Sequence, residues 1–194
     1  MEKQIDPRIL RTRKLIMDAF IELSMKRDFK DITIKDITTA ATVNRATFYS
    51  HFMDKYDLLE KVLSESVMRE IIQEVSTHEV INEETIKAIF LSIIKFLTSI
   101  SNQCQRSYEA FTPKIETIFK EELQAFFSEW AQKQWSSQNK MEIEAFAVML
   151  SWALYGAAVH WMQNQTAHPE DYVKQLLPLI KNRININKEN VNLI

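Results

Sequence analysis

Apolar residues recur every three or four positions along most of this chain, the spacing of residues on one face of an α-helix. The first such segment runs to about Arg27 and follows Asp6, which can cap a helix that has proline at its first position. Comparable segments are predicted over 54–76, 82–100, 102–110, 112–137, 140–164 and 169–182. Pro178 lies inside the last of them and predicts a kink or an early end there.

Between Thr33 and Lys55 the same periodicity predicts two short helices around a tight turn. Thr33 and Asn44 each carry a side-chain oxygen that can accept from a backbone N–H one turn later, so a helix is expected to begin at each. The apolar positions point inward and are Ile34, Ile37 and Ala41 in the first helix and Phe48 and Phe52 in the second. The outer surface of the second helix then presents Arg45, Ala46, Thr47, Tyr49, Ser50 and His51. This layout is typical of a helix-turn-helix that enters the major groove of DNA.

The composition favours helices over a sheet. The chain of 194 residues has 1 glycine and 4 prolines, and 46% of its residues are hydrophobic, enough for one or two helical domains. The single cysteine, Cys104, cannot form an internal disulfide, which fits a reducing cytoplasm, and we expect it to be a buried, small apolar side chain. We therefore expect an all-α, cytoplasmic protein of about nine helices.

An apolar run over 145–162 is long enough to raise the question of a membrane span. Ser151, Tyr155 and His160 interrupt this run, and no basic flank follows it. The N-terminus, MEKQIDPRIL, has no apolar segment of the kind that a secretion signal needs. We expect a helix buried on both sides in a bundle and no membrane partner.

The charge is distributed unevenly along the chain. Residues 1–55 hold 11 Lys and Arg against 8 Asp and Glu, a balance of +3, which leaves 13 against 18, or −5, for residues 56–194. The basic end is the end with the helix-turn-helix. A balance of this size supports DNA binding without establishing it, since an ordinary solvated surface can carry the same charge.

The sequence ITIKDITTAATVNRATFYSHFMDKYDLL, together with RTRKLIMDAFIEL upstream, resembles the tetracycline-repressor (TetR) family of bacterial transcriptional regulators. The resemblance implies a three-helix DNA-binding domain over 1–53 and a helical-bundle domain for ligand binding and dimerisation over 54–194. One position departs from the family, because Thr42 stands in the turn where glycine is usual. A β-branched residue is poorly suited to positive φ, so we expect strain of about 1–2 kcal/mol in this turn.

The resemblance also assigns roles within the motif. It implies phosphate contacts by Thr33, Tyr49, His51 and Lys55. Arg45 can present two donors to a guanine, and Ala46 is small enough to contact a thymine methyl. Lys35, Asn44 and Thr47 complete the predicted DNA-binding set.

The larger domain carries many aromatic residues, which either form an ordinary core or line a pocket for an apolar or aromatic effector. Tyr108, Tyr155 and His160 could orient such an effector, although a histidine on an apolar helix is more often satisfied within the core. The predicted ligand-binding residues are Phe90, Tyr108, Phe111, Phe119, Phe126, Trp130, Trp152, Tyr155 and His160.

The segment 143–162 is apolar on two faces, of which a lone monomer would rarely need both. We expect it to pair, with 169–182, against a second copy in a two-fold four-helix interface. The predicted interface residues are Leu154, Ala157, Trp161, Tyr172, Leu176 and Ile180. Two-fold symmetry would then place two recognition helices on a palindromic operator in double-stranded DNA.

No group of residues has the spacing of metal ligands, a nucleotide-binding loop or a catalytic triad, so we expect no metal, cofactor or enzymatic activity. The leading hypothesis is a homodimeric repressor that a small apolar or aromatic effector releases from its operator. The alternative is a helical module that binds a small molecule or a protein and whose DNA-binding end is vestigial. Thr42 and the modest positive charge are the only support for that alternative.

Overall fold

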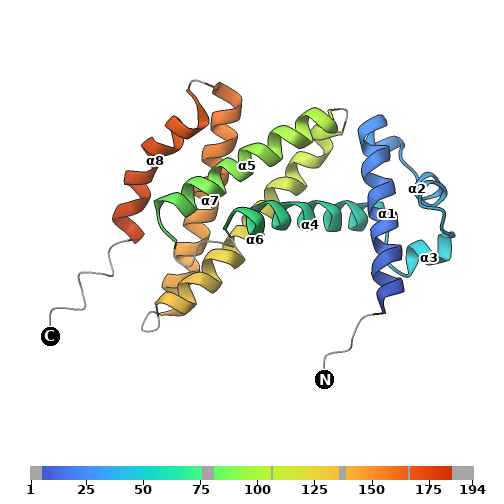
Figure 1. Cartoon of the computed structure of the whole chain (residues 1–194), viewed down its shortest axis with the longest axis horizontal. Coiled ribbons are helices and arrows are strands. Elements are labelled where there is room, and N and C mark those ends of the chain that lie inside the picture. The colour runs from blue at the N-terminus through green and yellow to red at the C-terminus, as the bar shows by residue number, and fades with distance from the viewer. Residues whose placement is uncertain (1–5, 76–80, 106, 136–138, 166, 185–194) are drawn as a thin grey trace. The chain divides into compact units, whose positions relative to one another are not determined.

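The computed structural model of the chain describes residues 6–75, 81–105, 107–135, 139–165 and 167–184. In this part the chain forms eight α-helices and one short 3-10 helix (Figure 1). They are α1 (Pro7–Lys26), η1 (Phe29–Asp31), α2 (Ile34–Ala40), α3 (Arg45–Tyr49), α4 (Lys55–Val75), α5 (Glu83–Gln103), α6 (Tyr108–Gln134), α7 (Lys140–Asn164) and α8 (Pro169–Ile184). The prediction of an all-α protein is confirmed.

Most helices begin where a side chain can accept from the first free N–H groups. The carboxylate of Asp6 accepts from the N–H of Arg8 at 2.9 Å, with proline at the start of α1. The side chain of Asn82 accepts from the N–H of Thr85 at 3.0 Å ahead of α5. Asp54 accepts from two N–H groups in the first turn of α4, each at 2.8 Å. These starts agree with the predicted ones.

Two prolines lie inside helices where a boundary was expected. The separate helices predicted over 102–110 and from Thr112 onward are wrong, because α5 ends at Gln103 and α6 runs from Tyr108 through Pro113. Pro113 lies in the second turn of α6, where it removes the bond that an N–H would make to the carbonyl of Glu109 and its ring crowds that carbonyl. Of the kink or early end expected at Pro178, the early end is not found, since α8 continues to Ile184.

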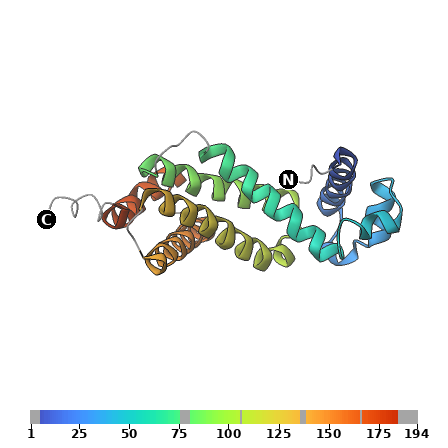
Figure 2. The same ribbon diagram turned by 90° about the horizontal axis from the view of Figure 1, so that it is seen from below.

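The chain divides into two compact units, residues 1–66 with 99–115 and residues 67–98 with 116–194. The helices α4, α5 and α6 are each continuous and contribute residues to both units (Figure 2). Compactness does not define which residues bind DNA, so the functional boundary predicted after residue 53 stays a prediction.

The core of the first unit is built from the predicted inward positions. Ile37 and Phe48 are fully buried, and Phe52 is buried beside Phe48 with the ring centroids 5.8 Å apart. Phe20 of α1 is also buried and closes this core. Cys104 is buried as expected, and burial raises the pKa of its thiol.

In the second unit, α7 has one buried and one exposed apolar face. The buried face consists of Ile143, Phe146, Ala147, Leu150, Ser151, Leu154, Tyr155 and Ala158. On the opposite face Met149 and Trp152 are 50% and 55% exposed. By length and composition α7 is apolar enough to cross a membrane, but 44% of its most apolar window is buried in the structure. Burial on both sides, as expected from the sequence, is therefore not found within the described chain.

The turn between α2 and α3 places Thr42 at a φ of 55°, in the left-handed region. The N–H of Thr42 donates to the carbonyl of Thr39 at 3.2 Å, and the N–H of Val43 donates to the carbonyl of Thr38 at 3.0 Å. These bonds end α2 and reverse the chain into α3. The positive φ predicted at this β-branched residue is confirmed.

Thr42→Gly is expected to stabilise the protein. Glycine relieves about 1–2 kcal/mol of left-handed strain in the folded state. It also gives the unfolded chain more conformational entropy, which stabilises that chain by a smaller amount, so the free energy of unfolding should rise by about 0.5–1 kcal/mol. Ala40→Gly is the matched control, because it puts a glycine on exposed backbone with helical φ, and it should destabilise. Urea denaturation measures both variants. A Thr42→Gly protein less stable than wild type contradicts the account of strain.

Candidate DNA-binding interface

The two short helices of the motif are held at their starts by side-chain caps. The hydroxyl of Thr33 accepts from the N–H of Asp36 at 3.2 Å, while the carboxylate of Asp36 accepts from the N–H of Thr33 at 2.9 Å. The side chain of Asn44 accepts from the N–H of Thr47 at 2.7 Å at the start of α3. Both predicted caps are confirmed.

An arginine and a tyrosine form a pair on the exposed face of α3. The Arg45 guanidinium donates to the Tyr49 hydroxyl at 3.1 Å and lies 5.5 Å from the centre of the tyrosine ring. Both side chains are exposed, with Tyr49 at 46%. Guanidinium groups have five N–H donors, so this bond leaves others for a ligand. Arg45, the predicted base contact, and Tyr49, a predicted phosphate contact, therefore lie side by side on α3.

The other predicted DNA-binding residues surround this pair with different degrees of exposure. Thr33, Lys35, Asn44 and Ala46 are exposed, while Thr47, His51 and Lys55 are half-buried. The Thr47 hydroxyl donates to the Asn44 side chain at 3.0 Å, which supports the cap of α3. The ammonium of Lys55 donates to three backbone carbonyls of the segment between α1 and α2.

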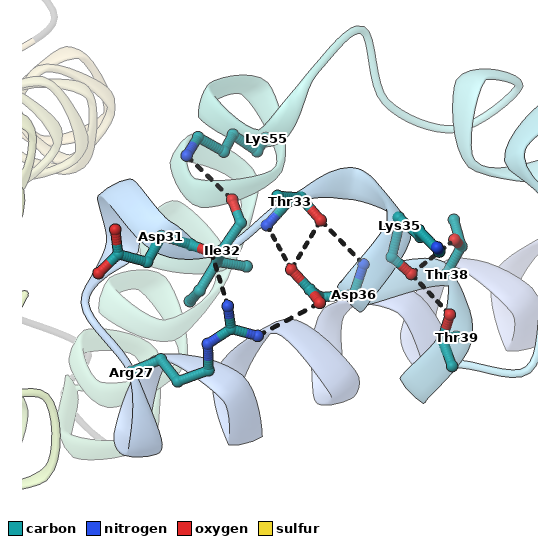
Figure 3. A network of polar contacts seen from close by, with 9 residues as sticks. All are labelled: Arg27, Asp31, Ile32, Thr33, Lys35, Asp36, Thr38, Thr39 and Lys55. Carbon is teal, nitrogen blue, oxygen red and sulfur yellow. Dashed lines mark hydrogen bonds and ion pairs between the residues drawn. The ribbon is translucent and has the colours of Figure 1, made fainter.

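Residues 27–33, which we call the connector, join α1 to α2 and are held by a polar network (Figure 3). The Arg27 guanidinium donates to the Asp31 carbonyl at 2.8 Å and lies 3.3 Å from a carboxylate oxygen of Asp36. The hydroxyl of Ser107 accepts from the N–H of Phe29 at 2.8 Å.

Sequence reasoning missed Arg27, Asp36 and Ser107 as parts of this site. The spacing of Thr33 and Asp36 is that of a capping box and could have revealed the carboxylate. No local signal marks Ser107, because it contacts a residue 78 positions away.

Hydrogen bonds from Thr33, first from its hydroxyl and then from its backbone N–H, lower the pKa of Asp36 from 3.8 to about 2, with a smaller contribution from Arg27. A carboxyl whose pKa is lower in the folded state stabilises the fold above its unfolded pKa. That stabilisation is lost as the pH falls from about 4 to about 2.

Asp36→Ala is expected to lower the free energy of unfolding by about 1 kcal/mol at pH 7, since it removes the reciprocal cap of α2. The difference from wild type should shrink as the pH falls below about 4, because the wild-type carboxyl is then progressively protonated. Asp18→Ala, at an exposed position of α1, is the control. Denaturation curves at several pH values test this, and a difference that stays constant down to pH 2 contradicts it.

The predicted ligand-binding residues do not form one group. Phe111 belongs to the first unit, where its ring lies 5.4 Å from that of Phe29, and Tyr108 precedes it on α6. In the second unit Phe119 lies 5.6 Å from Tyr155. The other predicted residues are Phe90, which is buried, Phe126 and Trp130, which are half-buried, and Trp152 and His160, which are exposed.

The predicted interface residues are also placed differently from one another. Leu154 is fully buried inside the protomer, so its side chain is not available to a partner, and this part of the prediction is corrected. Ala157, Trp161, Tyr172, Leu176 and Ile180 are half-buried. The Tyr172 hydroxyl lies 3.1 Å from Nδ1 of His160, and the Trp161 indole donates to the carbonyl of Ala167 at 2.8 Å. Periodicity had identified two apolar faces of α7 without showing which one points inward.

Comparison with known proteins addresses the first unit most directly. Residues 16–62 match the family model described as bacterial regulatory proteins, tetR family. This segment, about a quarter of the chain, is similar to the TetR family. This TetR match includes all of the predicted DNA-binding residues, from Thr33 to Lys55, although their individual contacts stay predictions.

Two regulators and a solved structure illustrate the similarity. The chain is 38% identical over 102 residues to the uncharacterized HTH-type transcriptional regulator YxbF of Bacillus subtilis (strain 168), a match that covers 52% of this chain and 27% of that protein. It is 23% identical over 206 residues to the probable acrEF/envCD operon repressor of Escherichia coli (strain K12), covering 94% and 89% of the two chains. The fold resembles that of FadR from Bacillus subtilis in complex with stearoyl-CoA, with a TM-score of 0.51, 17% identity, and 86% and 96% of the chains covered.

Proposed function

We propose that this protein is a TetR-family DNA-binding transcriptional regulator that acts as a homodimer on a palindromic operator. In this proposal it acts as a repressor, and a small apolar or aromatic effector releases it by weakening its hold on the operator. The observation that carries the proposal is the exposed Arg45–Tyr49 pair on a capped α3, inside the segment that matches the TetR family. The likeness to regulators over nearly the whole chain supports the same class of function.

The chemistry of the exposed α3 face suits both kinds of DNA contact. Arg45 can donate to the N7 and O6 of a guanine, and Ala46 can approach a thymine methyl. The hydroxyl of Tyr49 and the ring of His51 are suited to phosphates, with Thr33 and Lys35 contributing from α2. Phosphate contacts fix the register, so sequence information depends mainly on Arg45 and Ala46.

Arg45→Ala is expected to weaken binding to the operator by about 10-fold to 100-fold and to relax the preference for one base pair, because a bidentate contact contributes about 1–3 kcal/mol of discrimination. Tyr49→Ala should weaken operator binding and binding to random duplex together, since it removes a phosphate contact. Met25→Ala, at an exposed position of α1, is the control. Fluorescence anisotropy with DNA from upstream of the gene and random duplex as competitor measures these effects.

Wild-type protein that shows no preference for any DNA over random duplex contradicts the proposed function. That outcome favours the alternative of a helical binding module with a vestigial DNA-binding end.

The exposed apolar face of α7 supports a homodimer. Met149 and Trp152 are 50% and 55% exposed, and nothing lies within 4 Å of where a Cβ at Gly156 would point, so a second helix can approach closely there. Exposed apolar side chains next to small residues are typical of an interface between copies. A two-fold axis through this face would present two α3 helices to two operator half-sites.

Trp152→Glu is expected to convert the dimer into monomers, because a carboxylate would be desolvated between two apolar surfaces. Sedimentation velocity at micromolar concentration measures the change, and operator affinity should fall with it. Gln132→Glu, at an exposed position of α6, adds the same charge and serves as the control. A Trp152→Glu protein that remains dimeric places the interface elsewhere.

The class of effector is the least constrained part of the proposal. Its support is the aromatic content of the second unit and the fold shared with a regulator whose structure contains stearoyl-CoA. Coupling of effector and operator requires only about 1–3 kcal/mol of differential affinity. A bound effector that leaves operator affinity unchanged contradicts this regulation.

A further inference from the structure

Lys55, the first residue of α4, has its ammonium bonded to the backbone of the connector. Its Nζ donates to the carbonyls of Phe29, Lys30 and Ile32 at 3.0, 3.1 and 2.9 Å. An ammonium has three donors, and these three carbonyls use all of them. A phosphate would therefore have to compete with three backbone carbonyls, and two of these bonds are partly buried.

The surroundings of Lys55 favour this arrangement over a solvent-facing one. Two of the acceptors are carbonyls of η1, which carry partial negative charge like those at the end of any helix. The ring of Phe29 adds a cation–π contact, with Nζ 4.7 Å from the ring centre. Loss of the ammonium would take this donor from two partly buried bonds, those to the carbonyls of Phe29 and Ile32, which costs more than the loss of an exposed contact.

The connector that Lys55 holds is fastened from other sides as well. Ser107, which is 1% exposed, accepts from the N–H of Phe29 at 2.8 Å and donates to the carbonyl of Arg27 at 3.4 Å. Lys55 follows α3 closely along the chain, and the connector leads directly into α2. The lysine thus links the exit of the helix-turn-helix to the connector at its entry, and its contact with Ile32 is visible in Figure 3.

We infer that Lys55 is a positioning residue that orients the recognition helix through the connector, and that it is not a phosphate ligand. This inference rests on the proposed function, because orientation is read out as specific DNA binding. It departs from the phosphate contact that the family resemblance implies for this lysine.

The test compares Lys55→Met and Lys55→Arg with wild type by anisotropy on the operator and on random duplex, over a range of salt concentrations. Methionine keeps the apolar stem and removes the charge. Arginine keeps the charge, but its planar fork cannot direct donors to three carbonyls around one point, whereas it would serve a phosphate at least as well as lysine. Lys30→Gln removes an exposed charge from the same segment and controls for long-range electrostatics.

Both Lys55 variants are expected to lose about tenfold or more in operator affinity while affinity for random duplex stays within about twofold of wild type. The slope of log affinity against log salt should match that of wild type, because no phosphate contact is lost. Ser107→Ala should lower the ratio of specific to non-specific affinity in the same direction, and Lys30→Gln should leave it unchanged. Circular dichroism establishes a temperature at which each variant is folded, and Lys55→Arg and Ser107→Ala carry the test if Lys55→Met does not fold.

Two results overturn the positioning role. A Lys55→Met protein that loses operator and random-duplex affinity together, with a slope reduced by about 1, has lost a phosphate ligand, and Lys55→Arg would then retain binding. Variants with a lower melting temperature and unchanged affinities show a role in stability alone. Wild-type protein without specific binding is a separate result, because it removes the proposed function and the positioning role with it.

Discussion

The helix-turn-helix of this protein depends on how the backbone polar groups between α1 and α2 are satisfied. The connector has few helical partners for its N–H and C=O groups, and buried groups of this kind must be paired. Arg27, Lys55 and Ser107 supply those partners from three different parts of the chain. The helices that follow contain only 7 and 5 residues, too short to be stable without caps and a packed core. The caps at Thr33 and Asn44 and the buried core are therefore needed to hold these two helices.

Packing and capping within the motif determine which side chains stay available for DNA. Phe48 and Phe52 use one face of the motif for the core, and Asn44 is committed to capping α3. Arg45 and Tyr49 remain exposed and in contact with each other on the opposite face. A recognition surface this small can read only a few base pairs, which explains why a second copy related by two-fold symmetry belongs to the proposed function.

The sequence predicts local features of this fold better than distant ones. The caps at Thr33 and Asn44 follow from residue chemistry within one turn, and the structure confirms them. The positive φ at Thr42 was expected only because the family usually has glycine there, since threonine itself disfavours that conformation. The role of Ser107 could not be predicted, because nothing local relates it to Phe29, 78 residues earlier. Periodicity also cannot choose between two apolar faces of one helix, so Leu154 was expected at an interface although it belongs to the core.

Selection from a library of random DNA duplexes would show whether this protein recognises a specific operator through a two-fold arrangement of α3 helices. The purified full-length protein is bound to the library at physiological salt, and the retained duplexes are amplified and sequenced over several rounds. We expect enrichment of an inverted repeat whose half-sites lie about one helical turn, or a multiple of it, apart. Retained DNA without an enriched motif would contradict it.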